Sequence, residues 1–96
     1  MILDFSGLRV LVTGGAGGIG TEICRELHAL GAEVVVHYHR SKLQAEDLAK
    51  EIGGSAIQAD LTKEEDVLNL FKQIENLHGS LDCCVANAGK LSLIHI

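Results

Sequence analysis

Four short apolar runs alternate along this chain with three segments whose apolar residues recur at helical spacing. The runs are residues 9–13, 33–38, 56–59 and 81–86, and the helical segments are residues 19–30, 43–52 and 63–78, each followed by glycine. Thr62, with Glu65 three residues later, predicts a capping box at the start of the third helix. Short connections of this kind join parallel strands through right-handed crossovers, with helices on both faces. The alternation predicts an α/β fold in the order β-α-β-α-β-α-β.

The composition favours a small globular domain over a nucleic-acid-binding or membrane-spanning protein. The chain has 96 residues, enough for one small domain, and 47% of them are apolar with only three aromatics, which predicts an aliphatic core. A net charge of -5 argues against a nonspecific nucleic-acid binder, which would carry a basic face. No apolar stretch approaches the length of a membrane span, and the start lacks a basic segment followed by a long apolar one. We therefore expect a cytoplasmic protein with neither nucleic acid nor membrane as a partner.

The cysteines and histidines do not predict a metal site. Cys24, Cys83 and Cys84 are odd in number, and two are adjacent inside an apolar run, which favours reduced, buried, cytosolic thiols over disulfides. A zinc site would need better ligand spacing than these cysteines offer. His37 and His39 share one face of a strand but have no third ligand nearby in sequence. We expect no bound metal.

A glycine-rich segment lies between the first strand and its helix. Gly15, Gly17 and Gly20 satisfy G-x-G-x-x-G, while Thr13, Gly14, Gly18 and Gly20 satisfy T-G-x-x-x-G-x-G. Glycine permits a tight turn and a close backbone approach to a pyrophosphate, and the following helix presents free N–H groups to that anion. The alternative is a turn that only lets the helix pack on the sheet. A P-loop is excluded because Thr21 stands where its lysine is needed. We predict that a dinucleotide contacts Gly14, Gly15, Gly18, Ile19 and Gly20.

The segment Thr-Gly-Gly-Ala-Gly-Gly-Ile-Gly resembles the nucleotide signature of the short-chain dehydrogenase/reductase family, and the similarity runs from about Leu8 to Gly89. The resemblance implies a Rossmann-type parallel sheet, truncated here, with strand order 3-2-1-4. It also implies that Asp60, followed by Leu61, accepts a hydrogen bond from the adenine amino group. The stretch from Ala86 to Gly89 is similar to the family's Asn-Asn-Ala-Gly, with Ala86 replacing the first Asn. By resemblance, Asn87, Ala88 and Gly89 lie at the inner ribose of the cofactor.

The end of the second strand indicates which nicotinamide cofactor is used. A carboxylate roughly 20 residues past the glycines usually holds a free ribose 2′-hydroxyl. This chain has Tyr38, His39, Arg40 and Ser41 there, and no acid between Glu33 and Glu46. Arg40 can pair with a 2′-phosphate and Ser41 can donate to it. The segment His-Tyr-His-Arg-Ser is also similar to the 2′-phosphate segment of pteridine reductases. We predict NADP(H) rather than NAD. The alternative is that Arg40 is an ordinary solvated charge. One observation counts against NADP(H): many NADP-dependent members of the family carry a second basic residue in the glycine loop, and Gly17 stands at that position here.

The resemblance implies an oxidoreductase that acts on CH–OH groups and moves hydride between NADP(H) and a small carbonyl or alcohol substrate. Family members use a Ser and a Tyr-x-x-x-Lys pair for the proton transfer. The single tyrosine, Tyr38, lies at the end of the second strand, which is the wrong element for that role. We therefore expect no catalytic residue in this chain and no activity from it alone. The resemblance also implies a homo-oligomeric parent enzyme. The substrate is not readable, since 3-oxoacyl reductases and sugar or polyol dehydrogenases are equally similar.

The last residues differ from the rest. We assign residues 1–90 to an incomplete dinucleotide-binding portion. Residues 91–96 do not resemble the family's continuation, and they match a translation of CTG TCT CTT ATA CAC ATC, which is similar to a transposon-end sequencing adapter. We interpret them as a non-native tail. The fourth strand should then have an unpaired edge.

Two other functions remain open. The first is a non-catalytic dinucleotide-binding module with a regulatory role, which the downstream gene sequence would distinguish from an enzyme by the absence of Ser and Tyr-x-x-x-Lys. The second is a methyltransferase, whose sheet also begins with a glycine-rich loop. That fold usually has an acid at the end of the second strand, and none is present here.

Overall fold

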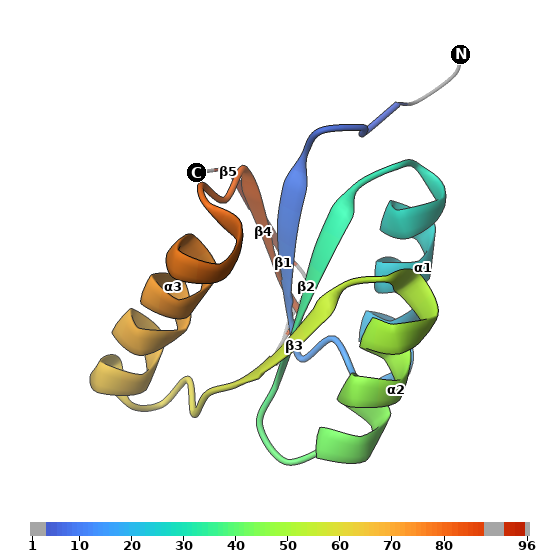
Figure 1. Cartoon of the computed structure of the whole chain (residues 1–96). Coiled ribbons are helices and arrows are strands. Elements are labelled where there is room, and N and C mark those ends of the chain that lie inside the picture. The colour runs from blue at the N-terminus through green and yellow to red at the C-terminus, as the bar shows by residue number, and fades with distance from the viewer. Residues whose placement is uncertain (1–3, 88–91, 96) are drawn as a thin grey trace.

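A five-stranded sheet forms the centre of the molecule (Figure 1). The computed structural model describes residues 4–87 and 92–95. The strands are β1 (Arg9–Thr13), β2 (Glu33–Tyr38), β3 (Ser55–Gln58), β4 (Cys83–Ala86) and β5 (Ser92–His95), and the helices are α1 (Gly18–Ala29), α2 (Lys42–Ile52) and α3 (Glu64–His78). The sheet order is β3-β2-β1-β4-β5. The predicted order 3-2-1-4 and the alternation of strands and helices are confirmed.

The first four strands are parallel, so their carboxyl ends meet at one edge of the sheet. Val10 is in register with Val34 of β2 on one side and with Cys83 of β4 on the other. The chain moves outward from β1 through β2 to β3, and then returns to place β4 against the other side of β1. Ligands of open α/β sheets bind where the strand order reverses in this way. A ligand site is therefore expected at the carboxyl end of β1.

The core consists of two apolar layers because neighbouring residues of a strand point to opposite faces. Figure 1 shows α1 and α2 on one face of the sheet and α3 on the other. The first layer contains Val10, Val12, Val34, Val36, Cys24, Ala45, Leu48 and Ile52. The second contains Leu11, Val35, Ile57, Ala59, Leu70, Ile74 and Cys84. Burial of both faces explains why the strands are continuous apolar runs rather than alternating ones.

The edge of β4 is paired, contrary to the expectation from the sequence. β5 lies antiparallel to β4, with Ser92 opposite Ala86 and His95 opposite Cys83. An extended segment that follows β4 satisfies the backbone N–H and C=O groups of that edge, which is the physical reason for the pairing. The expected unpaired edge is therefore wrong. The interpretation of residues 91–96 as a non-native tail stays a prediction.

The capping box predicted for the third helix is also wrong. α3 begins at Glu64, and Lys63 occupies its N-cap without a side-chain hydrogen bond to the helix. The Thr62 hydroxyl instead donates to Asp60 Oδ1 at 2.6 Å. A short-range carboxylate acceptor competes with the helix amide for the same hydroxyl, and here the carboxylate wins. Thr62 therefore belongs to the loop at the end of β3.

The cysteines are free thiols, with Cys24 and Cys84 buried and Cys83 half-buried. Burial raises the pKa of the Cys24 thiol to about 12, so that this group is neutral and unreactive at physiological pH. Within residues 4–87 and 92–95, no cluster of three or more metal-ligating side chains occurs. No helix in that part of the chain is both long and apolar enough to cross a membrane.

Candidate functional site

The glycine loop begins with a left-handed turn directly after β1. Gly14 has φ of 63°, a conformation that side chains with a Cβ rarely adopt. The loop is held against β2 by two backbone donors. Gly14 N–H donates to His37 Nδ1 at 2.9 Å, and Gly15 N–H donates to the His37 carbonyl at 3.0 Å. The turn therefore leaves the sheet at a fixed angle toward the first residue of α1.

Gly20 allows α1 to lie against this turn. A Cβ on Gly20 would collide with the Gly14 carbonyl oxygen, and it would lie 2.8 Å from Gly15 Cα and 2.9 Å from Asn87 Nδ2. Gly18 is different, because a Cβ there would meet no protein atom within 4 Å. The first of these glycines is thus required by packing within the protein. The second opens onto free space at the start of the helix, where a ligand can approach the backbone.

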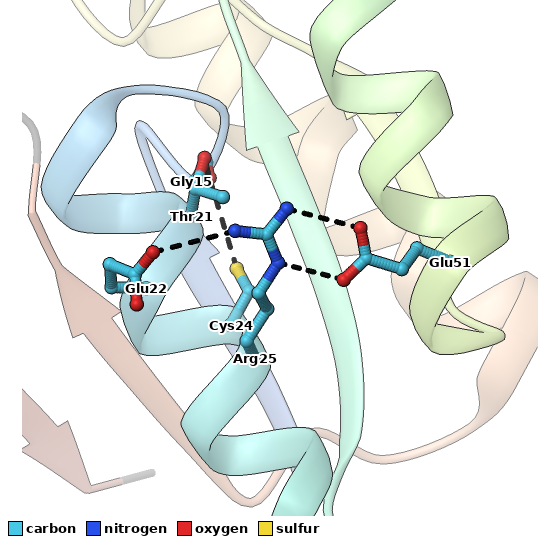
Figure 2. A network of polar contacts seen from close by, with 6 residues as sticks. All are labelled: Gly15, Thr21, Glu22, Cys24, Arg25 and Glu51. Carbon is cyan, nitrogen blue, oxygen red and sulfur yellow. Dashed lines mark hydrogen bonds and ion pairs between the residues drawn. The ribbon is translucent and has the colours of Figure 1, made fainter.

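The Gly15 carbonyl is turned away from that open space. Figure 2 shows that both Thr21 and Cys24 of α1 approach it. The Thr21 hydroxyl donates at 3.4 Å and the Cys24 thiol at 3.9 Å, both to Gly15 O. This acceptor is thus used inside the fold and does not oppose an anion that approaches the start of α1.

The start of α1 has unsatisfied amides. Gly17 occupies the N-cap and has no side chain that could accept a hydrogen bond. Among the described residues, the N–H groups of Gly18, Ile19 and Gly20 have no acceptor, and the first intrahelical bond runs from Thr21 N–H to Gly17 O. Both the free donors and the positive end of the helix dipole favour a bound anion at this point.

An exposed ion pair joins α1 to the neighbouring helix α2. Arg25 contacts Glu51 through two hydrogen bonds of 2.7 and 3.1 Å, and Glu22 at 3.4 Å (Figure 2). The bidentate geometry fixes the side chain of Arg25 on the outside of α1. Because Glu51 is the last residue but one of α2, this contact ties the middle of α1 to the far end of α2. Arg25 is therefore engaged away from the glycine loop.

The end of β4 clamps the glycine loop from the other side. Asn87 Nδ2 donates to the Gly14 carbonyl at 3.2 Å, and Asn87 N–H donates to Thr13 Oγ1 at 2.9 Å. The Thr13 hydroxyl in turn donates to the Val85 carbonyl at 3.3 Å. Ala86, which replaces an Asn of the family motif, adds no side-chain bond to this clamp. The predicted site residues Ala88 and Gly89 lie outside the described residues.

Replacing Asn87 with alanine tests this clamp. The variant should lose about 0.5–1.5 kcal/mol of unfolding free energy, because the Gly14 carbonyl loses its side-chain donor. Urea titration followed by circular dichroism measures the change. Asn76→Ala is the matched control, since Asn76 is exposed on α3 and the same amide is removed there. An equal effect of the two substitutions would contradict the clamp.

The end of β2 forms a pocket together with the glycine loop. The pocket has a volume of about 310 Å³ and is lined by Gly14, Ala16, Gly17, Tyr38, His39, Arg40 and Ser41. Arg40 is exposed, and among the described residues no carboxylate forms an ion pair with it. The structure therefore brings the glycine loop and the segment from Tyr38 to Ser41 around one pocket, although α1 and β2 separate them in sequence. The pocket carries an available cation beside the glycine loop.

The end of β3 supplies a carboxylate. Asp60 Oδ1 accepts hydrogen bonds from the Thr62 amide at 3.0 Å and the Thr62 hydroxyl at 2.6 Å. These bonds lower the pKa of the Asp60 carboxyl, so that it is ionised at neutral pH. Asp60 Oδ2 lies 3.8 Å from His39 Nε2, which links the ends of β2 and β3. Leu61 is half-buried against the core layer beneath α3.

Tyr38 and Lys42 are not arranged as a proton-transfer pair. Their sequence spacing is that of Tyr-x-x-x-Lys, but Tyr38 ends β2 and Lys42 begins α2. Side chains four residues apart become neighbours only when both lie on one helix. The structure therefore offers no support for a catalytic role of Tyr38, and the expectation of no catalytic residue stays a prediction.

His37 was not predicted as a cofactor contact, although it begins the His-Tyr-His-Arg-Ser segment and was considered as a metal ligand. Its side chain is 2% exposed, and its ring bonds both the glycine loop and the end of β3. The available signal was a polar residue inside the run Glu-Val-Val-Val-His-Tyr. A buried polar side chain must have hydrogen-bond partners, and the strand end leaves few candidates for them.

Two other hollows are present. One, of about 410 Å³, runs along the outside of α1 from Gly18 to Leu27 and so begins at the free amides, and the other, of about 750 Å³, lies at the end of α3 near Phe71 and Leu81. The first contains two glutamates, Glu22 and Glu26, and no cation. Neither hollow adjoins the free amides together with a basic side chain, so neither suits a phosphorylated ligand.

Comparison with known proteins gives a consistent picture. A family model described as short chain dehydrogenase matches residues 9–95. The short-chain dehydrogenase/reductase homolog YusS of Bacillus subtilis is 46% identical over 83 residues, which are 81% of this chain and 76% of YusS. The hydroxynaphthalene reductase-like protein Arp2 of Metarhizium robertsii is 42% identical over 90% of this chain and 34% of its own length.

Solved structures of short-chain dehydrogenases and reductases also resemble this chain. A short chain dehydrogenase from Burkholderia cenocepacia, in complex with NADP, matches with a TM-score of 0.81 and 36% identity, over 85% of this chain and 36% of that one. The NADP complex of RhlG from Pseudomonas aeruginosa matches with a TM-score of 0.78 and 32% identity, over 88% and 34%. The chain thus spans about a third of most of these relatives and about three quarters of YusS.

Proposed function

This chain belongs to the short-chain dehydrogenase/reductase family, and on that premise we propose that it is the NADP(H)-binding part of an oxidoreductase. The cofactor would lie across the carboxyl ends of the parallel strands, with its diphosphate at the start of α1. The observation that carries the proposal is the set of amides at Gly18, Ile19 and Gly20 that find no acceptor among the described residues, beside an open glycine face and an Arg40 that has no carboxylate partner there. When bound, the cofactor supplies or accepts hydride.

The residues present fit a dinucleotide. Free N–H groups at a helix start suit a diphosphate, and the Gly15 carbonyl, an acceptor that would repel it, is used by Thr21 and Cys24 inside the fold. The Gly18 position, where no protein atom would meet a Cβ, leaves room for the phosphates to reach the backbone. In this assignment Gly14 and Gly15 shape the turn, while Gly18, Ile19 and Gly20 donate.

Arg40 and Ser41 would bind the 2′-phosphate of NADP(H). Arg40 is a guanidinium without a carboxylate partner in the described part of the chain, at the rim of the pocket that also contains Tyr38 and His39. A free guanidinium suits a phosphate dianion, whereas a ribose diol gains little from it. Three of the structural relatives, including a blue fluorescent protein from a metagenomic library, are complexes with NADP or NADPH.

The remaining predicted contacts fit the two ends of the cofactor. The ionised Asp60 would accept a hydrogen bond from the adenine amino group, and Leu61, which follows it, would contact the ring. Asn87 is held at the end of β4 beside the glycine loop, and with Ala88 and Gly89 it would border the inner ribose. Each of these contacts is a proposal.

For the whole protein we propose hydride transfer between NADP(H) and a small carbonyl or alcohol substrate. Family resemblance assigns the proton transfer to a Ser and a Tyr-x-x-x-Lys pair, and this chain contains no such set on one helix. The chain alone would therefore bind cofactor without turnover. We further propose that the parent enzyme is a cytoplasmic homo-oligomer with no membrane or nucleic-acid partner.

Calorimetric titration of the chain with NADPH and with NADH tests the proposed binding. Tighter binding of NADPH at one saturable site is the expected result. Absence of heat and of any fluorescence change with both nucleotides would refute it. Sequencing the gene beyond residue 96 tests the proposed reaction, for which an in-frame Ser and Tyr-x-x-x-Lys are required.

A second candidate is a non-catalytic dinucleotide-binding module. It is favoured by the mutual coverage with YusS, 81% of this chain and 76% of that one, which means that a relative of similar length exists. This candidate predicts the same nucleotide binding but a gene that ends without the catalytic residues. A reductase assay with the complete gene product therefore separates the two candidates.

A further inference from the structure

The His37 imidazole joins two segments that are far apart in sequence. It lies on β2 with its side chain 2% exposed, and it is one of two buried polar residues in the described part of the chain, Thr13 being the other. Nδ1 lies 2.9 Å from Gly14 N, and Nε2 lies 2.8 Å from the Ala59 carbonyl oxygen. One ring therefore contacts both the glycine loop and the end of β3.

These two contacts fix the tautomer of the ring. A backbone amide can only donate, so Nδ1 must keep its lone pair toward Gly14. A carbonyl can only accept, so Nε2 must carry the hydrogen toward Ala59. The ring is neutral, with its hydrogen on Nε2. The opposite tautomer would lose both hydrogen bonds at once, and the imidazolium would place an N–H against the N–H of Gly14.

The two residues that the ring contacts, Gly14 and Ala59, each adjoin a segment of the proposed cofactor site. Gly14 is the first residue of the glycine loop, whose later amides point at the proposed diphosphate position. Ala59 precedes Asp60, the proposed acceptor for adenine. A second bond from β2, Gly15 N–H to the His37 carbonyl, fixes the same loop through the main chain. His37 thus contributes to the separation between the two ends of the site, together with the backbone bond from Ala59 N–H to the Tyr38 carbonyl.

We propose that His37 is a positioning residue of the dinucleotide site, holding the glycine loop through Nδ1 and the end of β3 through Nε2–H. The proposal rests on the proposed NADP(H) binding and assigns no direct contact between His37 and the cofactor. It differs from the metal-ligand role considered for His37 and His39, because both ring nitrogens are already used by the backbone.

The surroundings favour the neutral ring. Burial, the largest effect, lowers the pKa of His37, the hydrogen bond to the Ala59 carbonyl raises it, and the nearby His39 lowers it. The titratable groups near its partners include Asp60 at the end of β3, Lys63, which acts on Asp60, Asp66 of α3, which accepts from Asp60 N–H, and Cys24 of α1, whose thiol donates to Gly15 O.

Because the folded pKa lies below the ordinary value of 6.5, the neutral ring contributes its full stability above that pH. This contribution is lost as the pH falls from 6.5 toward the lower folded value, and nothing further is lost below it. Affinity for NADPH should weaken only as the pH falls to the folded pKa of His37 and below it, because the ring of the folded chain stays neutral above that pH and the glycine loop keeps its acceptor.

Two substitutions separate the two ring nitrogens. In His37→Asn, the side-chain oxygen can take the place of Nδ1 and accept from Gly14, whereas in His37→Gln the longer side chain can reach Ala59 and leaves Gly14 without its acceptor. We expect His37→Asn to bind NADPH within about threefold of the parent chain and His37→Gln to bind about tenfold more weakly, the effect of one lost hydrogen bond. Calorimetry measures both constants. A purely structural role would give equal losses.

A measurement on the unsubstituted chain decides the matter if either variant fails to fold. In a ¹⁵N-labelled sample at neutral pH, Nδ1 should be unprotonated, Nε2 should be protonated, and a coupling across the hydrogen bond should connect Gly14 N with His37 Nδ1. A protonated Nδ1, or equal losses in the two variants, would overturn the inference while leaving NADPH binding intact. If the unsubstituted chain does not bind NADPH at all, the proposed function fails instead.

Discussion

The Gly20→Ala variant is expected to lose about 1–3 kcal/mol of unfolding free energy and its affinity for NADPH, the effect of forcing atoms into a close-packed site. The added Cβ would collide with the Gly14 carbonyl oxygen and crowd Gly15 Cα and Asn87 Nδ2. Two of these three neighbours are backbone atoms, so the collision cannot be relieved by a side-chain rotation. The helix would have to move away from the loop. Thermal or urea unfolding measures the first effect, and calorimetry with NADPH measures the second.

Gly18→Ala is the matched control, since it adds the same methyl group two residues earlier. A Cβ at Gly18 meets no protein atom within 4 Å, and alanine in a helix is favoured over glycine by up to about 1 kcal/mol. The variant should therefore be as stable as the parent chain or slightly more stable. NADPH should nevertheless bind about tenfold more weakly if the diphosphate occupies that space. Unchanged NADPH affinity in Gly18→Ala would contradict the placement of the diphosphate.

Arg40→Ala should weaken binding of NADPH by about 10- to 100-fold, the equivalent of one hydrogen-bonded charge pair of 1.5–3 kcal/mol. Binding of NADH should be nearly unchanged, because it has no 2′-phosphate for the guanidinium to pair with. The preference for NADPH should also shrink as the salt concentration rises, since Arg40 is exposed and its interaction is screened.

Lys50→Ala serves as the control for overall charge. Lys50 is an exposed cation in the last turn of α2, at the opposite end of that helix from Ser41. Its removal changes the net charge of the chain by the same amount as Arg40→Ala. NADPH affinity should stay close to that of the parent chain. If Arg40→Ala weakens NADPH and NADH equally, the 2′-phosphate assignment is wrong.

The parallel part of the fold could be predicted because each element carried its own local signal. The strands are apolar runs buried on both faces, and each helix shows an apolar stripe and a following glycine. β5 was missed although Leu-Ser-Leu-Ile-His has an alternating, strand-like pattern. Whether a strand pairs with the edge of β4 depends on which segment of the folded chain lies beside that edge, and this cannot be read from the residues alone. The false capping box has a similar origin, because Thr62 had a nearer acceptor in Asp60.

Part of the candidate site could likewise be predicted from the sequence, and part could not. The glycine loop and the segment from Tyr38 to Ser41 could be found because their residues are contiguous and their chemistry follows from residue type. The structure brings both segments around one pocket, as the strand order requires. The clamp of Thr13 and Asn87 and the bridge through His37 could not be found in this way. The clamp joins residues 74 positions apart, and the His37 bridge joins residues 22 and 23 positions apart. Whether such residues form a hydrogen bond depends on which atoms face each other in the folded chain.

The most direct test of the account is a ¹H–¹⁵N spectrum of the labelled chain, recorded while NADP⁺ is added. The largest changes should occur at the amides of Gly18, Ile19 and Gly20, with smaller ones around Arg40, because a diphosphate would satisfy donors that have no acceptor in the described part of the chain. If those amides stay in place, or if the changes fall instead along the outer face of α1 or at the end of α3, the nucleotide site has been assigned to the wrong part of the molecule.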